Sequence, residues 1–100
     1  MTRSNILDRA KECVCGQREQ DYGSPENNFQ LIANLWNSYL GDNYISEVDV
    51  AMMMALLKIA RIRSGNYTAD SFIDLAGYAA CGGEIASIKI KKKENEDDRK

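Results

Sequence analysis

Residues 70–81 read DSFIDLAGYAAC, a run of small and apolar residues that contains two carboxylates. The apolar positions of this run continue at helical spacing toward the lysine-rich end of the chain. They are Phe72, Ile73, Ala76, Ala80 and Ile85. We therefore predict a long helix that begins near residues 68–70. No segment of the sequence gives a comparable β-strand pattern, so the chain is expected to be all-α.

Three further helices are predicted upstream, each from its own start and stop signals. The first covers residues 4–18. The second begins at Pro25, because Ser24 can cap it and proline suits the first helical position, and it ends at Gly41. The third begins after Ser46, which forms a capping box with Asp49, and ends at residues 64–66. Its predicted buried positions are Val50, Met53, Met54, Leu57 and Ala60. The four segments predict a compact four-helix bundle.

The length of 100 residues corresponds to a single domain. We assign residues 1–90 to this domain and residues 91–100 to a charged C-terminal tail whose helix frays before its end. A chain of this size buries only about 60 to 65% of its unfolded surface. The methionine-rich and aromatic segments have more apolar surface than one small core can bury. We therefore expect a homo-oligomer, a dimer or tetramer with helices packed across subunits.

The net charge of -2 is unevenly distributed. Residues 1–88 carry 7 basic and 11 acidic side chains, whereas residues 89–100 carry 6 basic and 4 acidic ones. The body of the chain is therefore not expected to bind nucleic acid by bulk charge. No apolar run long enough for a membrane helix or a signal peptide is present, which predicts a cytoplasmic protein without membrane contact. With three cysteines and no histidine, a four-ligand zinc site is not expected.

Two carboxylates of the opening stretch, Asp70 and Asp74, stand four residues apart, with Tyr78 one turn further along. This spacing places all three on one face of a helix, where two carboxylates can bind Mg²⁺. Asp70 has an alternative role, because an acidic residue in the first turn complements the helix dipole. Asp74 lies in an apolar context and needs a cation. The alternative to a metal is an ion pair with the preceding helix.

The preceding helix supplies basic side chains for such contacts. Lys58 and Arg61 are three residues apart and share a face, so they are candidates to bind phosphate groups. Basic residues in a last turn also complement the helix dipole, which is the alternative for Arg61. Glu47 and Asp49, at the start of the same helix, are weaker candidate metal ligands, because their first-turn position makes capping the default explanation.

The loop around residues 20–29 is the second concentration of polar chemistry. A helix N-terminus flanked by Ser24, Asn28 and the ring of Tyr22 can bind a phosphate or stack a base. Ordinary turn chemistry also explains the glycine, serine and proline of this loop.

Three segments together resemble a family of small phage and prophage proteins of unassigned function. They read DYGSPENNF, DVAMMMALLKIARI and DSFIDLAGYAAC. Over roughly residues 6–88 the chain also resembles the all-α MazG-like nucleoside triphosphate pyrophosphatases. That second resemblance implies a site assembled across subunits. In such a site, acidic motifs on two helices bind Mg²⁺, and the metal positions a triphosphate for attack by water. Asp74 and Asp70 match the later motif, whereas the earlier one is replaced by Glu47 and Asp49, two residues apart.

These observations lead to three hypotheses. In the first, the chain is a Mg²⁺-dependent nucleotide pyrophosphohydrolase, with Asp70 and Asp74 as catalytic metal ligands and with Lys58 and Arg61 on the phosphates. In the second, it is a phage protein that binds and sequesters a nucleotide without turnover, including a cyclic signal of host defence. In the third, it is a structural or adaptor bundle in which the polar row is an internal ion pair.

Overall fold

The computed structural model describes residues 1–16, 24–65 and 67–98. Within these ranges the chain forms four α-helices and no strand, which confirms the predicted all-α class. The helices are α1 (Arg3–Cys15), α3 (Pro25–Leu40), α4 (Glu47–Arg63) and α5 (Ala69–Asp98). None of these helices combines the length and apolar character needed to cross a bilayer.

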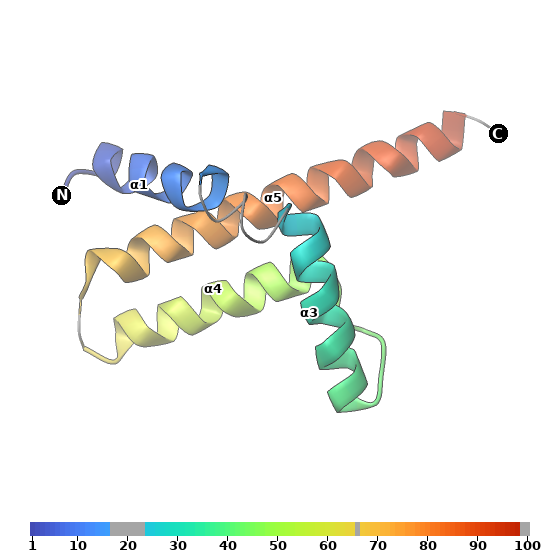
Figure 1. Ribbon diagram of the computed structural model, residues 1–100, viewed down its shortest axis with the longest axis horizontal. Coiled ribbons are helices and arrows are strands. Elements are labelled where there is room, and N and C mark those ends of the chain that lie inside the picture. Colours follow the sequence, from blue (N-terminus) through green and yellow to red (C-terminus); the bar gives the residue numbers. More distant parts are fainter. Residues whose placement is uncertain (17–23, 66, 99–100) are drawn as a thin grey trace.

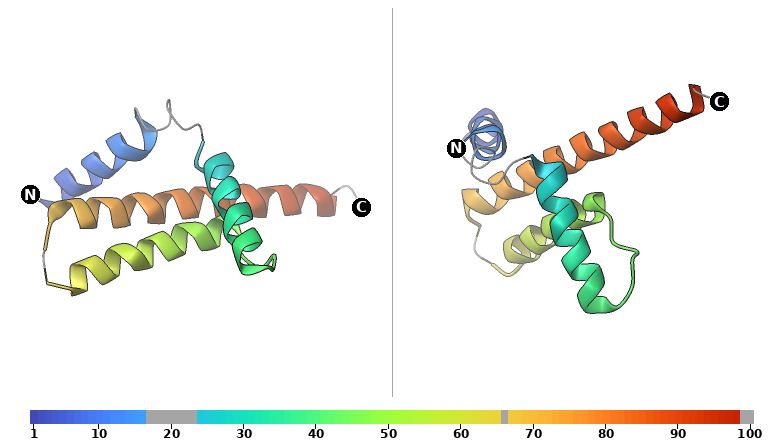
Figure 2. Two further views of the ribbon diagram at one scale, coloured as in Figure 1. Left: turned by 60° about the horizontal axis from the view of Figure 1, so that its bottom comes forward. Right: turned by 45° about the vertical axis from the view of Figure 1, so that its right-hand side comes forward.

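The arrangement is organised around α5, which extends along the longest dimension of the molecule (Figure 1). Helix α1 packs on one side of α5, and α4 runs beside its other side in the opposite direction. Helix α3 crosses near the beginning of α4 (Figure 2). The outer dimensions are 50 × 32 × 24 Å, and the side of α4 away from α5 is left largely uncovered.

Local signals fix where the helices begin. The Ser46 hydroxyl accepts the Asp49 amide at 3.1 Å, while the Asp49 carboxylate accepts the Ser46 amide at 2.9 Å, so the predicted capping box is confirmed. Ser24 caps α3 with Pro25 behind it, also as predicted. Gly41 ends α3 in the left-handed conformation (φ 74°), which glycine adopts without a steric cost.

The ends of α1 and α5 can be compared with the sequence-based expectation, and only that of α1 differs from it. α1 ends at Cys15, three residues earlier than expected, because Gly16 leaves the helical conformation. α5 continues to Asp98, so the charged segment is helical as far as it is described. Lysine and glutamate are good helix formers, and Lys92 stands one turn before Glu96, a spacing at which opposite charges stabilise a helix.

The core lies where α3, α4 and α5 meet. Its buried members are Phe29, Ala33, Val50, Ala51, Cys81 and Ile85. Trp36 packs against this cluster without being fully buried. Gly82 permits the close contact of α5 with α4, because a Cβ at this position would lie 3.1 Å from the Ala51 Cβ and 3.0 Å from the Met52 Cε.

The predicted buried positions of α4 were right in part. Val50 is buried and Met54 packs half-buried against the core, but Met53 and Leu57 are each 43% exposed and Ala60 is also exposed. Ala51 and Ala55, which were not predicted, are also buried. Small residues occupy the contact because α5 approaches closely there. On α5, similarly, Ile73 and Ile85 are buried as expected, whereas Phe72 and Ala80 are exposed.

Candidate functional site

The centre of the predicted polar row is an ion pair between α4 and α5. The Lys58 Nζ atom lies 3.0 Å from an Asp74 carboxylate oxygen. The Lys58 side chain is only 13% exposed and that of Asp74 is 40% exposed. Because α4 and α5 run side by side in opposite directions, residues 58 and 74 reach the same level of the pair. The predicted contact of Asp74 with the preceding helix is therefore present.

Two other candidates flank this pair at the surface. Arg61 is exposed one turn beyond Lys58, and Asp70 is exposed one turn before Asp74, in the first turn of α5. Neither side chain forms an ion pair with another residue in the part of the chain that the structure describes. Both are therefore accessible to a ligand from solvent.

Tyr78 continues the row toward α3. Its ring is half-buried and lies 6.3 Å, centroid to centroid, from the ring of Phe29, with an interplanar angle of 33°. The tyrosine therefore helps to pack α3 against α5.

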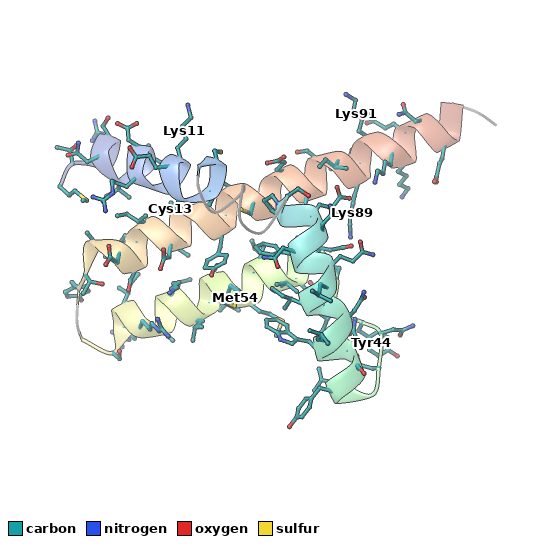
Figure 3. The ribbon with its side chains drawn as sticks, in the orientation of Figure 1. Lys11, Cys13, Tyr44, Met54, Lys89 and Lys91 are labelled. Atoms are coloured by element: carbon teal, nitrogen blue, oxygen red, sulfur yellow. The ribbon has the colours of Figure 1, made fainter. Side chains whose placement is uncertain are left out.

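Glu47 and Asp49 lie at the other end of α4. Glu47 precedes Lys58 by eleven residues, which corresponds to about 16 Å along a helix. Its carboxylate pairs with Lys89, which extends from α5 toward the beginning of α4 (Figure 3). The hydrogen bond from Lys89 holds the pKa of Glu47 below its ordinary value. Asp49 is occupied by the capping box.

The carboxylates of one chain consequently do not fit the predicted magnesium set. Asp70 and Asp74 lie near the beginning of α5, beside the end of α4, whereas Glu47 and Asp49 lie at the beginning of α4. Asp74 already faces an ammonium group. Among the described residues, no group of three histidine, cysteine, aspartate or glutamate side chains is placed to hold a metal ion.

The candidates of the loop around residues 20–29 have mainly structural contacts. The Ser24 hydroxyl accepts the Asn27 amide at 3.4 Å, and the Asn28 amide donates to the Ser24 carbonyl at 3.2 Å. The side chain of Asn28 is half-buried. Tyr22 lies outside the described residues, so its predicted role in binding stays a prediction.

Sequence reasoning missed one polar residue with a clear role. The Asn37 side chain donates to the Ile45 carbonyl and accepts the Ile45 amide, both at 2.9 Å. These two bonds fix the loop between α3 and α4. The signal in the sequence is an amide side chain in the last turn of a helix followed by a short polar loop.

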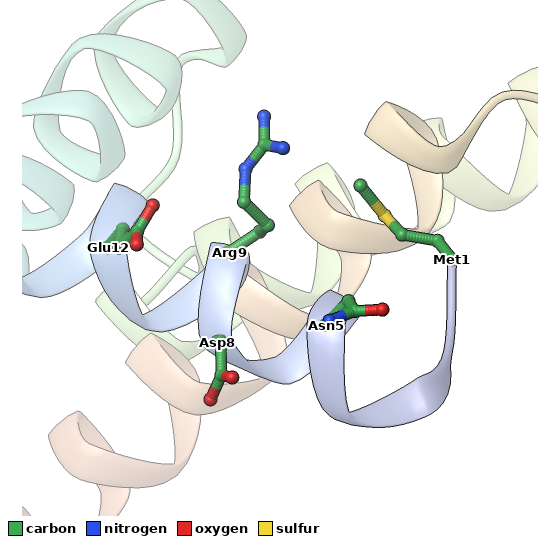
Figure 4. A pocket seen from close by; sticks show the side chains of 5 residues that line it. All are labelled: Met1, Asn5, Asp8, Arg9 and Glu12. Atoms are coloured by element: carbon green, nitrogen blue, oxygen red, sulfur yellow. The ribbon is translucent and has the colours of Figure 1, made fainter.

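A shallow hollow on α1 lies apart from all these residues. Its lining side chains are Met1, Asn5, Asp8, Arg9 and Glu12 (Figure 4). They come from a single helix and its cap, and Arg9 and Asp8 point to different sides (Figure 4). This hollow does not gather groups that could act together on a ligand.

The comparisons with known proteins point to a phage family. The chain is 47% identical over 77 residues to the Gene 55 protein of Mycobacterium phage D29, an alignment that covers 77% of this chain and 50% of that protein. It is also 47% identical over 75 residues to the Gene 55 protein of Mycobacterium phage L5, covering 75% of this chain and 48% of the relative. The chain thus spans about half the length of these curated relatives.

No solved structure matches the chain. A family described as a domain of unknown function, DUF6378, matches residues 5–86. This match and the phage relatives agree with the small phage family of unassigned function that the sequence motifs resemble. The chain belongs to the DUF6378 family.

Proposed function

We propose that this chain is a nucleotide-handling phage protein, related to the MazG-like proteins, which binds the phosphate groups of its ligand beside the Lys58–Asp74 pair. The observation that carries the proposal is the inward-facing Lys58, held at 3.0 Å from Asp74 and only 13% exposed. The resemblance of residues 6–88 to the MazG-like pyrophosphatases, in which Asp74 and Asp70 match the later acidic motif, favours a nucleotide as the ligand.

The chemistry of the two basic groups supports binding of a phosphate. An ammonium group has three N–H donors, and the contact with Asp74 leaves donors of Lys58 for a second acceptor. Arg61 lies one turn away and is exposed, so its guanidinium can form a bidentate contact with phosphate oxygens. Asp74 holds Lys58 in place before the ligand arrives, which lowers the entropy lost on binding.

Mg²⁺-dependent hydrolysis of the nucleotide is the second candidate function. The observation that favours it is Asp70, which is exposed one turn from Asp74 and has no ion-pair partner among the described residues. This carboxylate remains available to a cation. Under this alternative, further ligands come from another chain, since Glu47 and Asp49 of the same chain lie on a different level of the α4–α5 pair.

The test is a titration of the purified protein with a panel of nucleoside triphosphates, deoxynucleoside triphosphates and cyclic di- and trinucleotides, with and without Mg²⁺. We expect at least one nucleotide to raise the melting temperature, as binding to the folded state requires. Product analysis of the same samples by anion-exchange chromatography separates the two candidates. Intact ligand indicates binding alone, whereas Mg²⁺-dependent release of pyrophosphate indicates hydrolysis.

Replacement of Arg61 by Ala tests the assigned position of the phosphates. Removing one charged hydrogen-bond partner is expected to weaken binding by at least about 10-fold. Arg9→Ala, an exposed arginine on α1, is the matched control and should leave affinity unchanged. If no nucleotide binds, the proposed function is wrong. If both variants bind like the wild type, the assigned position of the phosphates is wrong.

A further inference from the structure

Helix α4 is apolar around its whole circumference between Asp49 and Arg61. Lys58 is the only charged residue in this interval, and it is turned inward to Asp74. The inner side carries the buried core residues. The outer side carries large exposed apolar side chains, which are Met53 (43% exposed), Leu56 (63%), Leu57 (43%) and Ile59 (46%). Met52 (41%) lies at its border, because its Cε atom reaches Gly82 of α5. A helix that is hydrophobic on all sides is typical of one covered on all sides.

The total surface shows that the molecule is more extended than a compact monomer. A compact monomer of 11.2 kDa exposes about 5,700 Å² by the general relation between surface and mass. This chain exposes 7436 Å². The charged end of α5, which projects beyond the other helices (Figure 1), contributes to this excess together with the outer side of α4. The radius of gyration, 15.4 Å, likewise exceeds the value of about 13 Å for a compact domain of this length.

A seam with a defined spacing runs along the exposed side of α4. It consists of five exposed residues, Asp49, Met52, Leu56, Ile59 and Arg63. Their separations alternate between three and four residues, which is the spacing of the a and d positions where one helix packs against another. The seam has an acidic residue at its first position, a basic residue at its last, and apolar residues between them.

We propose that this seam binds the same seam of a second copy of the chain, with the two α4 helices antiparallel about a two-fold axis at Leu56. In this arrangement Arg63 lies beside the partner's Asp49, and the symmetry forms this contact twice. A parallel arrangement would instead place like charges opposite one another at both ends. The charges therefore select the antiparallel dimer, and the apolar residues supply its buried area.

The contact of Asp49 with Ser46 is compatible with this role. The capping box occupies the Oδ2 atom of Asp49, which leaves its other oxygen for an arginine. The inference is independent of the proposed nucleotide function, because none of the five seam residues belongs to the group of Lys58, Arg61, Asp70 and Asp74.

Sedimentation velocity over a range of concentrations tests the dimer. The wild type is expected to sediment as a dimer at micromolar concentrations. Leu56→Glu places two carboxylates together on the two-fold axis, and we expect the dimer dissociation constant to rise by at least about 30-fold. Leu7→Glu is the matched control, since Leu7 is a similarly exposed leucine (62%) on α1. Circular dichroism verifies that both variants are folded.

Cross-linking tests the orientation of the helices. In a Cys13→Ser, Cys15→Ser background, one tagged chain carries Met52→Cys and an untagged chain carries Ala60→Cys. Antiparallel pairing about Leu56 brings these two positions together, so a short bismaleimide should link tagged to untagged chains. Links between identical positions are expected only in a parallel pair, because positions 52 of two antiparallel chains lie about 12 Å apart along the axis.

The outcomes that overturn the proposal are distinct. A wild type that stays monomeric leaves the seam to a different partner, and a Leu56→Glu variant that remains dimeric places the interface elsewhere. Predominant linking of identical positions contradicts the antiparallel arrangement. The nucleotide titration is unaffected by any of these results, since it can be carried out on a monomer.

Discussion

The two sides of α4 have nearly the same apolar character but different surroundings. On the inner side, Val50 and Ala51 are completely buried against α5, whose Gly82 allows close contact. On the outer side, larger residues such as Leu56 are more than half exposed. The difference shows that hydrophobicity alone does not decide which side of a helix faces its own core. Here small residues mark the close intramolecular contact, and the larger ones on the other side are exposed.

The strongest test of this difference compares one substitution on the two sides. Ile85→Ala removes a core side chain that is 1% exposed and is expected to lower the free energy of unfolding by about 2 to 5 kcal/mol. Ile59→Ala makes the same change on the outer side of α4, where we expect a loss below about 1 kcal/mol. Urea denaturation at a concentration where the chain is monomeric measures both values. Equal losses would contradict the distinction between the two sides.

A smaller effect is expected at the edge of the inner side, where Lys58 meets Asp74. Asp74→Ala leaves Lys58, whose side chain is 13% exposed, without its partner, which should lower the free energy of unfolding by about 1 to 2 kcal/mol. Asp70→Ala, an exposed carboxylate one turn away, is expected to change it by less than about 0.5 kcal/mol. The same denaturation measurement applies. A variant at residue 74 as stable as the one at residue 70 would show that the ion pair contributes nothing.

The smallest effect concerns the pH dependence at the start of α4. The pKa of Glu47 is lowered from 4.5 in the folded protein, chiefly by the hydrogen bond from Lys89. Because the pKa is lower in the folded protein, the unfolded chain binds a proton at a higher pH than the folded one. The ionised Glu47 therefore makes its full contribution to the free energy of unfolding above pH 4.5, and this contribution declines as the pH falls through the lowered pKa.

Melting temperatures of the wild type and of Glu47→Gln, measured across this interval, test the prediction. We expect the advantage of the wild type to shrink as the pH falls. A difference that stays constant with pH would show that the Glu47 charge does not contribute to stability.

The local features of the fold were predictable because neighbouring residues determine them. Ser46 with Asp49 begins α4 and Gly41 ends α3, in each case through contacts within a few residues. The buried side of α4 was not predictable in the same way. A helix that is apolar on all sides has no periodicity from which to infer its orientation, so the sequence could not show that Met53 and Leu57 are exposed while Ala51 and Ala55 are buried.

The contacts of the candidate site were likewise predictable only in part. The contact of Asp74 with Lys58 was predictable, because two consecutive antiparallel helices bring residues near their connection together. The contact of Glu47 with Lys89 was missed, since these residues are 42 positions apart and meet only through the packing of α4 on α5. That packing also separates Glu47 from Asp74, which is why the predicted set of metal ligands is not assembled within one chain.

The length of α5 has a consequence for how the chain folds. Its 30 residues correspond to about 45 Å of helix, nearly the full 50 Å extent of the molecule. Helices α1, α3 and α4 all pack against it. Among the described residues, the core between α3 and α4 includes Cys81 and Ile85 of α5, so it is incomplete once this helix melts. Unfolding of the central turns of α5 should therefore unfold the packed helices with it, in one cooperative transition.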